Sequence, residues 1–178
     1  MANGLRALRG SLLSLCCLAG LLASAPAQAQ YWQCVTFARA ASGIALFGDA
    51  YTWWNQAEGR YARGQAPAVG AVMVMKPGHG MRVGHVAMVS AVVDARTVKL
   101  THANWSVRGG VERDVTAIDV SAAGDWSEVR VWWGPTRSVG QTRYAVYGFI
   151  YPDAPSDDDP ADEAPTVTAE AQPAHAPA

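Results

Sequence analysis

The chain has 178 residues and a net charge of −1 at pH 7, and 50% of its residues are hydrophobic. Its arginines are scattered, whereas nucleic-acid binding requires clustered positive charge, so we expect no nucleic-acid partner. Beyond the first 29 residues no stretch has the roughly 20 apolar residues of a membrane helix, and we expect no integral membrane segment.

Residues 1–29 have the pattern of a secretory signal peptide. A short basic head precedes an apolar stretch from Leu12 to Ala23, and the segment ends in the small-residue sequence Ala27-Gln28-Ala29. The apolar stretch is too short to span a bilayer. We therefore expect an exported protein, periplasmic or secreted, whose mature chain begins at Gln30.

Removal of this signal peptide reduces three cysteines to one, because Cys16 and Cys17 leave with it and Cys34 remains. A single thiol cannot form an intramolecular disulfide, and in an oxidising compartment it is open to oxidation. The count alone leaves four interpretations: a reactive thiol, a bridge between two copies, a metal ligand, or a buried inert cysteine.

Acidic residues divide the rest of the chain in two. Pro152 to Ala178 contains seven acids, no Lys or Arg and no aromatic residue, which predicts an acidic, Ala/Pro-rich disordered tail over residues 152–178. Residues 30–151 contain seven tryptophans and are long enough for one domain with a core. Twelve Lys or Arg against eight acids make this domain positive, which mildly favours an anionic polymer as partner.

The first predicted elements are helices. Residues 33–45 contain mostly good helix formers, with Cys34 in the first turn and on the same face as Ala38 and Ala41. Small alanines beneath the thiol would let a sheet come close to it. A second short helix is predicted over residues 50–58.

From residue 71 onward the pattern changes to short β-rich runs separated by Gly, Pro, Asn and Asp. The predicted strands are residues 71–75, 85–93, 97–105, 128–133 and 145–151. Helices first and strands afterwards predict an α+β fold, with N-terminal helices packed on an antiparallel β-sheet.

Four residues are candidates for catalytic chemistry. A thiol at the start of a helix, such as Cys34, is favoured as thiolate by the helix dipole. A base is also required, and His85 opens an apolar β run, where a lone histidine is more often a core residue. Alternation along the next strand places His102 and Asn104 on one face, and a hairpin between the two strands would bring them to His85.

Several motifs follow one another in a distinctive order. They are Gln33-Cys34-Val35-Thr36-Phe37-Ala38, Gly48-Asp49-Ala50 with Trp53, Pro67 to Val74, Gly84-His85-Val86-Ala87, Asn104-Trp105 and Tyr147-Gly148-Phe149-Ile150. In order and spacing the chain resembles the CHAP domain, a family of cysteine- and histidine-dependent amidohydrolases and peptidases, from about residue 33 to 150. The resemblance implies a papain-like fold and hydrolysis of peptidoglycan amide bonds, either between muramic acid and the stem peptide or within the peptide.

The resemblance also implies roles for single residues. Cys34 matches the family's nucleophile and His85 its general base. Many members have Glu where His102 stands, so we expect His102 to hold the imidazole of His85, with Asn104 assisting. A carboxylate would stabilise the imidazolium more strongly, which predicts a weaker or more alkaline-shifted enzyme.

Two other interpretations remain. A zinc site of Cys34, His85 and His102 has admissible ligand types, but the spacings match no compact zinc motif, so we expect no metal and no cofactor. A catalytically inactive wall-binding module is the alternative to the hydrolase. In both cases the partner is peptidoglycan or its peptide fragments, and we expect a monomer. Trp105 could line a substrate groove or simply pack in the core.

Overall fold

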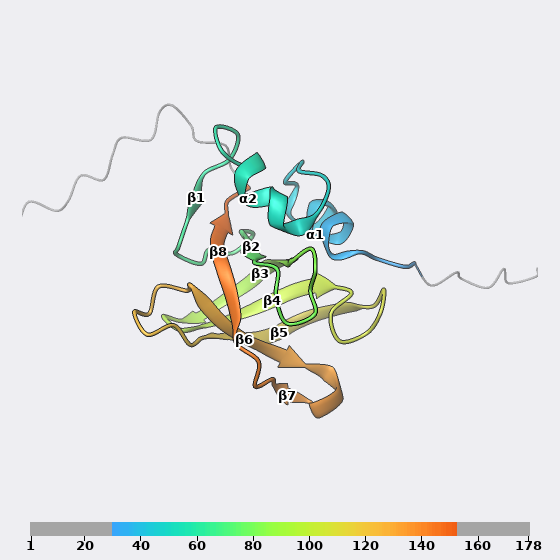
Figure 1. Cartoon of the computed structure of the whole chain (residues 1–178), viewed down its shortest axis with the longest axis vertical. Coiled ribbons are helices and arrows are strands. Elements are labelled where there is room, and N and C mark those ends of the chain that lie inside the picture. Colours follow the sequence, from blue (N-terminus) through green and yellow to red (C-terminus); the bar gives the residue numbers. More distant parts are fainter. Residues whose placement is uncertain (1–29, 153–178) are drawn as a thin grey trace, which may run out of the picture. The chain divides into compact units, whose positions relative to one another are not determined.

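A computed structural model describes residues 30–152 of the chain (Figure 1). The predicted signal peptide and, apart from Pro152, the predicted acidic tail lie outside the described residues, so both domain boundaries remain predictions. None of the helices between residues 30 and 152 has the length and apolar character needed to cross a membrane.

The described residues form short helices and eight strands. The helices are α1 (Cys34–Ser42), η1 (Ala50–Thr52), α2 (Trp53–Gln56) and η2 (Gly134–Thr136), of which η1 and η2 are 3-10 turns. The strands are β1 (Arg63–Gly64), β2 (Val72–Met75), β3 (His85–Asp94), β4 (Thr97–Ala103), β5 (Val111–Asp119), β6 (Glu128–Trp133), β7 (Ser138–Val139) and β8 (Tyr144–Ile150).

The strands close into a barrel. Antiparallel pairs run in the order β8-β2-β3-β4-β5-β6, and β8 pairs with β6 as well, so six strands form a closed ring. In Figure 1 the orange strand β8 passes from β2 towards β6. The first residues of β8 pair with β6 and the later ones with β2, and the β2–β8 register shifts between the pairs Val74–Gly148 and Met75–Val146. Gly148 has a φ of 145°, and an added Cβ would lie 2.5 Å from the carbonyl oxygen of Gly64, so this bend requires glycine.

The predicted papain-like α+β fold, with N-terminal helices packed on an antiparallel sheet, is therefore wrong. The described chain is mostly β, and its two α-helices have only nine and four residues. Helix α1 ends early because Gly43 adopts a left-handed conformation with a φ of 77°. The prediction also missed β5, whose many polar residues hide its alternation, and without β5 the ring cannot close.

Two hydrophobic cores lie on opposite faces of the barrel wall. Along β2, Met73 and Met75 belong to the inner core, whereas Val72 and Val74 pack with the α1 and α2 segment outside. All four side chains are buried, which explains why β2 is a continuous apolar run rather than an alternating one. Each buried side chain of this size contributes roughly 1.5–3 kcal/mol to folding.

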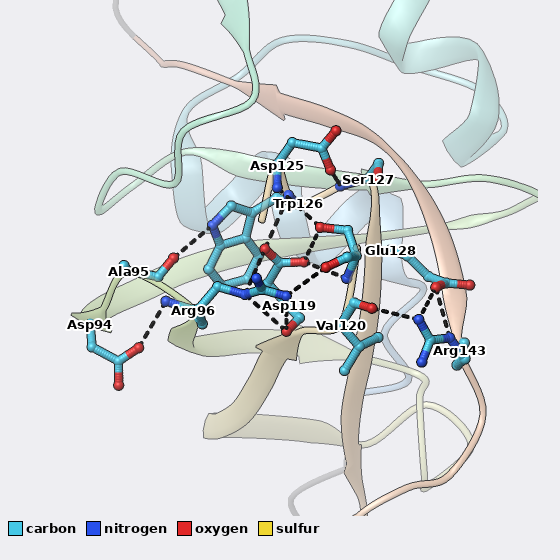
Figure 2. A network of polar contacts seen from close by, with 11 residues as sticks. Asp94, Ala95, Arg96, Asp119, Val120, Asp125, Trp126, Ser127, Glu128 and Arg143 are labelled. Atoms are coloured by element: carbon cyan, nitrogen blue, oxygen red, sulfur yellow. Dashed lines mark hydrogen bonds and ion pairs between the residues drawn. The ribbon is translucent and has the colours of Figure 1, made fainter. Parts of the chain in front are cut away.

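A polar network ties two loops together at one end of the β4–β5 pair (Figure 2). The buried carboxylate of Asp119 accepts hydrogen bonds from the backbone and hydroxyl of Ser121, at 2.8 and 2.6 Å, and pairs with Arg96 at 3.1 Å. The indole of Trp126 donates to the carbonyl of Ala95 at 3.2 Å. The β3–β4 turn is thus fastened to the β5–β6 connection, and the other end of the β4–β5 pair carries the candidate catalytic residues.

Candidate active site

Cys34 is the first residue of α1. Gln33 before it has an extended backbone, and the carbonyl of Gln33 accepts the first helical hydrogen bond from Phe37 at 3.0 Å. The thiol is 9% exposed and packs with Ala38 and Val86, where α1 lies against β3 and β4. The predicted helical face is corrected in part, because Phe37 is buried and Ala41 is exposed. The small residue that lets the sheet approach the thiol is Ala38.

The environment of the Cys34 thiol favours its neutral form. Burial raises its pKa, and the backbone N–H groups of Val86, Val35 and Cys34 itself only partly offset the rise. The predicted preference for thiolate at a helix start is therefore outweighed by desolvation. A thiol in this state needs a proton acceptor before it can act as a nucleophile.

His85 precedes Val86 in the chain, and the backbone N–H of Val86 faces the Cys34 thiol. His85 is the first residue of β3 and is 3% exposed. In the β2–β3 register His85 pairs with Met75 and lies on the barrel's inner face. Burial lowers the pKa of His85 well below its ordinary value, and the neighbouring His102 lowers it further. The ring is thus a neutral proton acceptor at physiological pH.

His102 lies next to His85, as the β3–β4 hairpin predicts. The Nε2 atom of His85 is 3.0 Å from the Nδ1 atom of His102, and the two rings meet nearly at right angles. Burial lowers the pKa of His102 to about 3, so this ring is neutral as well. Nε2 of His85 is occupied by the contact with His102. The second ring nitrogen of His85, Nδ1, is therefore available to a different partner.

Trp105 covers the two imidazoles. Its ring centroid lies 4.8 Å from that of His85 and 5.5 Å from that of His102. The indole is held in place by a hydrogen bond of 2.8 Å to the carbonyl of Trp132. Trp105 also borders a cavity of about 290 Å³, whereas Trp53 is fully buried in the outer core. The cavity is lined by Trp105, Val131, Trp133, Thr136, Ser138, Val139, Gly140, Gln141, Thr142 and Tyr144.

Asn104 takes a different position from the one predicted. Strand β4 ends at Ala103, and Asn104 adopts a left-handed conformation with a φ of 59°, so the alternation with His102 is broken. Its amide nitrogen donates to the side-chain oxygen of Gln33 at 3.0 Å, and its oxygen accepts from the backbone of Gly109 at 2.9 Å. Asn104 therefore orients the residue before Cys34 and has no hydrogen bond to the imidazoles.

The β4–β5 loop also anchors the chain before α1. The backbone of Trp32 donates to the carbonyl of Gly109 at 3.1 Å. A Cβ atom added to Gly109 would lie 2.3 Å from the Tyr31 ring, so this close approach requires glycine. Gly109 also has a φ of 70°, a conformation that favours glycine. The pair Gly109-Gly110 was the sequence signal for this close approach, and the sequence reasoning did not use it.

Glu112 is a further residue that the sequence reasoning missed. It lies on β5, directly opposite His102 in the β4–β5 register. Its Oε2 atom is 3.9 Å from the Nε2 atom of His102 and accepts a hydrogen bond from the backbone of Ser106 at 2.8 Å. Recognition of residues 111–119 as a strand would have placed this carboxylate beside His102.

Within residues 30–152, no group of three or more His, Cys, Asp or Glu side chains is arranged to hold a metal ion. The geometry therefore gives no support to a zinc site of Cys34, His85 and His102.

Comparison with known proteins gives a family match over part of the chain. The CHAP domain model matches residues 25–104, which include Cys34, His85, His102 and Asn104. The match ends before β5, whereas the motif resemblance extends to about residue 150. A search of curated proteins finds no match. The family match confirms the CHAP domain that the ordered motifs indicate, and because CHAP domains are generally cysteine- and histidine-dependent amidohydrolases, it points to a peptidoglycan hydrolase or amidase.

Proposed function

We propose that the protein is an exported cysteine hydrolase that cleaves amide bonds of peptidoglycan, with Cys34 as nucleophile and His85 as general base. One observation carries this proposal: the buried thiol at the start of α1 lies against the first residues of β3, where His85 is held by His102 at 3.0 Å. The signal-peptide pattern of residues 1–29 supports export.

The resting pair consists of a neutral thiol and a neutral imidazole. Burial acts in opposite directions on the two groups, raising the pKa of Cys34 and lowering that of His85. Charge separation before substrate binds is therefore unfavourable. Proton transfer from the thiol to Nδ1 of His85 accompanies attack on the substrate, which is general-base catalysis rather than attack by a preformed thiolate.

The reaction then follows acyl transfer. The sulfur of Cys34 forms a bond to the amide carbonyl carbon, and its proton moves to His85. His85 returns this proton to the leaving amine as the C–N bond breaks, which leaves a thioester. Water gives a proton to His85 and attacks the thioester, which releases the carboxylic acid and restores the thiol.

The oxyanion formed during attack requires hydrogen-bond donors. The backbone N–H of Cys34 lies at the first position of α1, where helical N–H groups have no partner within the helix. The side-chain oxygen of Gln33 is occupied by Asn104, so the Gln33 amide directs its NH₂ group elsewhere. Gln33 and the Cys34 backbone thus form the proposed oxyanion hole.

The cavity beyond Trp105 is the proposed site for part of the glycopeptide. Its walls combine aromatic surface from Trp133 and Tyr144 with the hydroxyls of Thr136 and Ser138. Such a mixture suits an amphipathic ligand, because aromatic faces cover apolar groups and hydroxyls orient polar ones. Trp105 lines this cavity, and its ring centroid is also 4.8 Å from that of His85, which supports the proposal.

The test uses the chain without residues 1–29, as wild type and as Cys34→Ala and Cys34→Ser variants. Each is incubated with peptidoglycan of several cross-link types under reducing conditions, and released fragments are identified by mass spectrometry. Free stem peptides or new amines from the wild type alone are expected, with a loss of at least about 10³-fold in the variants. Circular dichroism verifies that the variants are folded.

A binding module would give a different result. Folded wild-type protein that sediments with peptidoglycan but releases no fragment from any substrate would refute the hydrolase and support the inactive wall-binding alternative. The masses of the fragments also decide between cleavage next to muramic acid and cleavage within the peptide.

A further inference from the structure

The Nε2 atom of His102 is buried and has no hydrogen-bond partner within the part of the chain that the structure describes. Its other ring nitrogen, Nδ1, faces His85 at 3.0 Å. Buried polar atoms in folded proteins almost always have a partner, so an unpaired one needs an explanation. The nearest negatively charged side chain to consider is Glu112.

The carboxylate of Glu112 is fixed at a defined place. Its Oε2 atom is held by the backbone N–H of Ser106 at 2.8 Å and lies 3.9 Å from Nε2 of His102. This separation is roughly 1 Å longer than an N–H···O hydrogen bond, and catalytic hydrogen bonds often shorten when substrate binds. The Glu112 side chain is 13% exposed and that of His102 fully buried, so little solvent competes for the contact.

The contact decides where the protons of both imidazoles lie. A neutral imidazole carries one proton, and a carboxylate can only accept. With a proton on Nε2 of His102, directed at Glu112, Nδ1 of His102 is an acceptor. Nδ1 of His102 then accepts a hydrogen bond from the N–H at Nε2 of His85. Because a neutral His85 carries one proton, its Nδ1 is left unprotonated. The reverse order would leave His85 with its proton on Nδ1, where it could not accept the thiol proton.

We propose that Glu112 is a positioning residue that sets this proton order and so keeps Nδ1 of His85 available as the base for Cys34. The inference rests on the proposed function. The negative charge also stabilises the imidazolium that forms on His85, acting through the polarised ring of His102. The neighbouring strand thereby supplies the carboxylate that position 102 itself lacks.

The test compares Glu112→Gln, Glu112→Asp and the matched control Asp114→Asn. In Glu112→Gln, an NH₂ group in the place of Oε2 gives up the bond from Ser106, donates to Nε2 of His102 and reverses the proton order. The shorter aspartate side chain in Glu112→Asp keeps the negative charge. Asp114 lies on the same strand, is exposed, and has a φ of 53° that asparagine tolerates, so its replacement removes a charge without touching the histidines.

Two readouts separate positioning from mere stability. For Glu112→Gln we expect kcat to fall about 10- to 100-fold with KM changed less than about twofold, whereas Glu112→Asp recovers most of the rate and Asp114→Asn keeps it. In protein labelled with ¹⁵N-histidine, the ring nitrogens of His102 should report a proton on Nε2 in the wild type and on Nδ1 in Glu112→Gln. A His102→Gln spectrum assigns the signals.

An unchanged proton position in Glu112→Gln would overturn the proposal, as would equal losses of kcat in Glu112→Gln and Asp114→Asn. The spectra do not depend on activity. If the wild type releases no peptidoglycan fragment, the proposed function fails, while the spectra still decide whether Glu112 orders the two histidines.

Discussion

The side-chain amide of Asn104 donates a hydrogen bond of 3.0 Å to the side chain of Gln33, 71 residues earlier in the chain. This bond joins the end of β4 to the residue that precedes the candidate nucleophile. It gives Asn104 an effect on the site through Gln33, although Asn104 has no hydrogen bond to either imidazole. The relationship leads to a prediction about coupling.

We expect Gln33→Ala to lower kcat about 10²- to 10³-fold, because a donor to the oxyanion is lost. Asn104→Ala should cost about tenfold, since Gln33 remains but is no longer held. The double variant should be no slower than Gln33→Ala alone, because both changes act on one group. Steady-state kinetics of the three variants on a soluble muropeptide measure this, and strictly additive losses would contradict it.

Activity should persist below the ordinary pKa of histidine. The active state requires neutral His85, and burial lowers the pKa of this group well below 6.5. The acid limb of kcat/KM should therefore lie below pH 6.5, which is opposite to the alkaline shift expected from His102 in place of Glu. A pH profile of kcat/KM on a soluble muropeptide measures it, and an acid limb above pH 7 would refute this account of the site.

Folding stability should fall as the solution becomes acidic. His85 and His102 have lowered pKa values in the folded state, that of His102 being about 3, so the unfolded state binds more protons below pH 6.5. Stability is therefore complete above about pH 6.5 and is lost as the pH falls towards the folded pKa values. Each buried histidine contributes a loss of up to about 1.4 kcal/mol per pH unit.

Urea denaturation between pH 8 and pH 5 measures this dependence. His102→Gln should reduce the slope of unfolding free energy against pH, because one of the two titrating groups is gone. Equal slopes for wild type and His102→Gln would show that other groups control the acid response.

The Asp119 network should matter for stability and leave catalysis alone. Asp119→Ala leaves the buried backbone N–H groups of Ser121 and Trp126 without their carboxylate acceptor, so we expect a loss of about 1–3 kcal/mol. Arg143→Ala breaks the exposed pair with Glu128 in the same region and should cost at most about 1 kcal/mol. Chemical denaturation measures both losses. The rate per folded molecule should match the wild type in both, and a selective loss of kcat in Asp119→Ala would contradict this.

Local patterns in the sequence were sufficient to find the nucleophile candidate and part of the frame around it. Cys34 stands out because it is the single cysteine after residue 29. The motif Gly84-His85-Val86-Ala87 stands out because a titratable residue begins an apolar run. Strand β3 follows from its apolar β-rich run and β4 from its alternation, and a short turn between them made the hairpin with His102 predictable. The catalytic roles of these residues remain predictions.

The sequence by itself thus determined the start of α1 to within one residue and the first residues of β3 and β4, because helix propensity and β-rich runs between turn residues are properties of neighbouring residues. Only the tertiary structure decided that β8 pairs with β6, that the sheet closes into a barrel, and that Glu112 and Asn104 reach His102 and Gln33. Alternation assigns a side chain to a face but cannot show which strand edges meet. Those pairings depend on long-range packing of the whole chain.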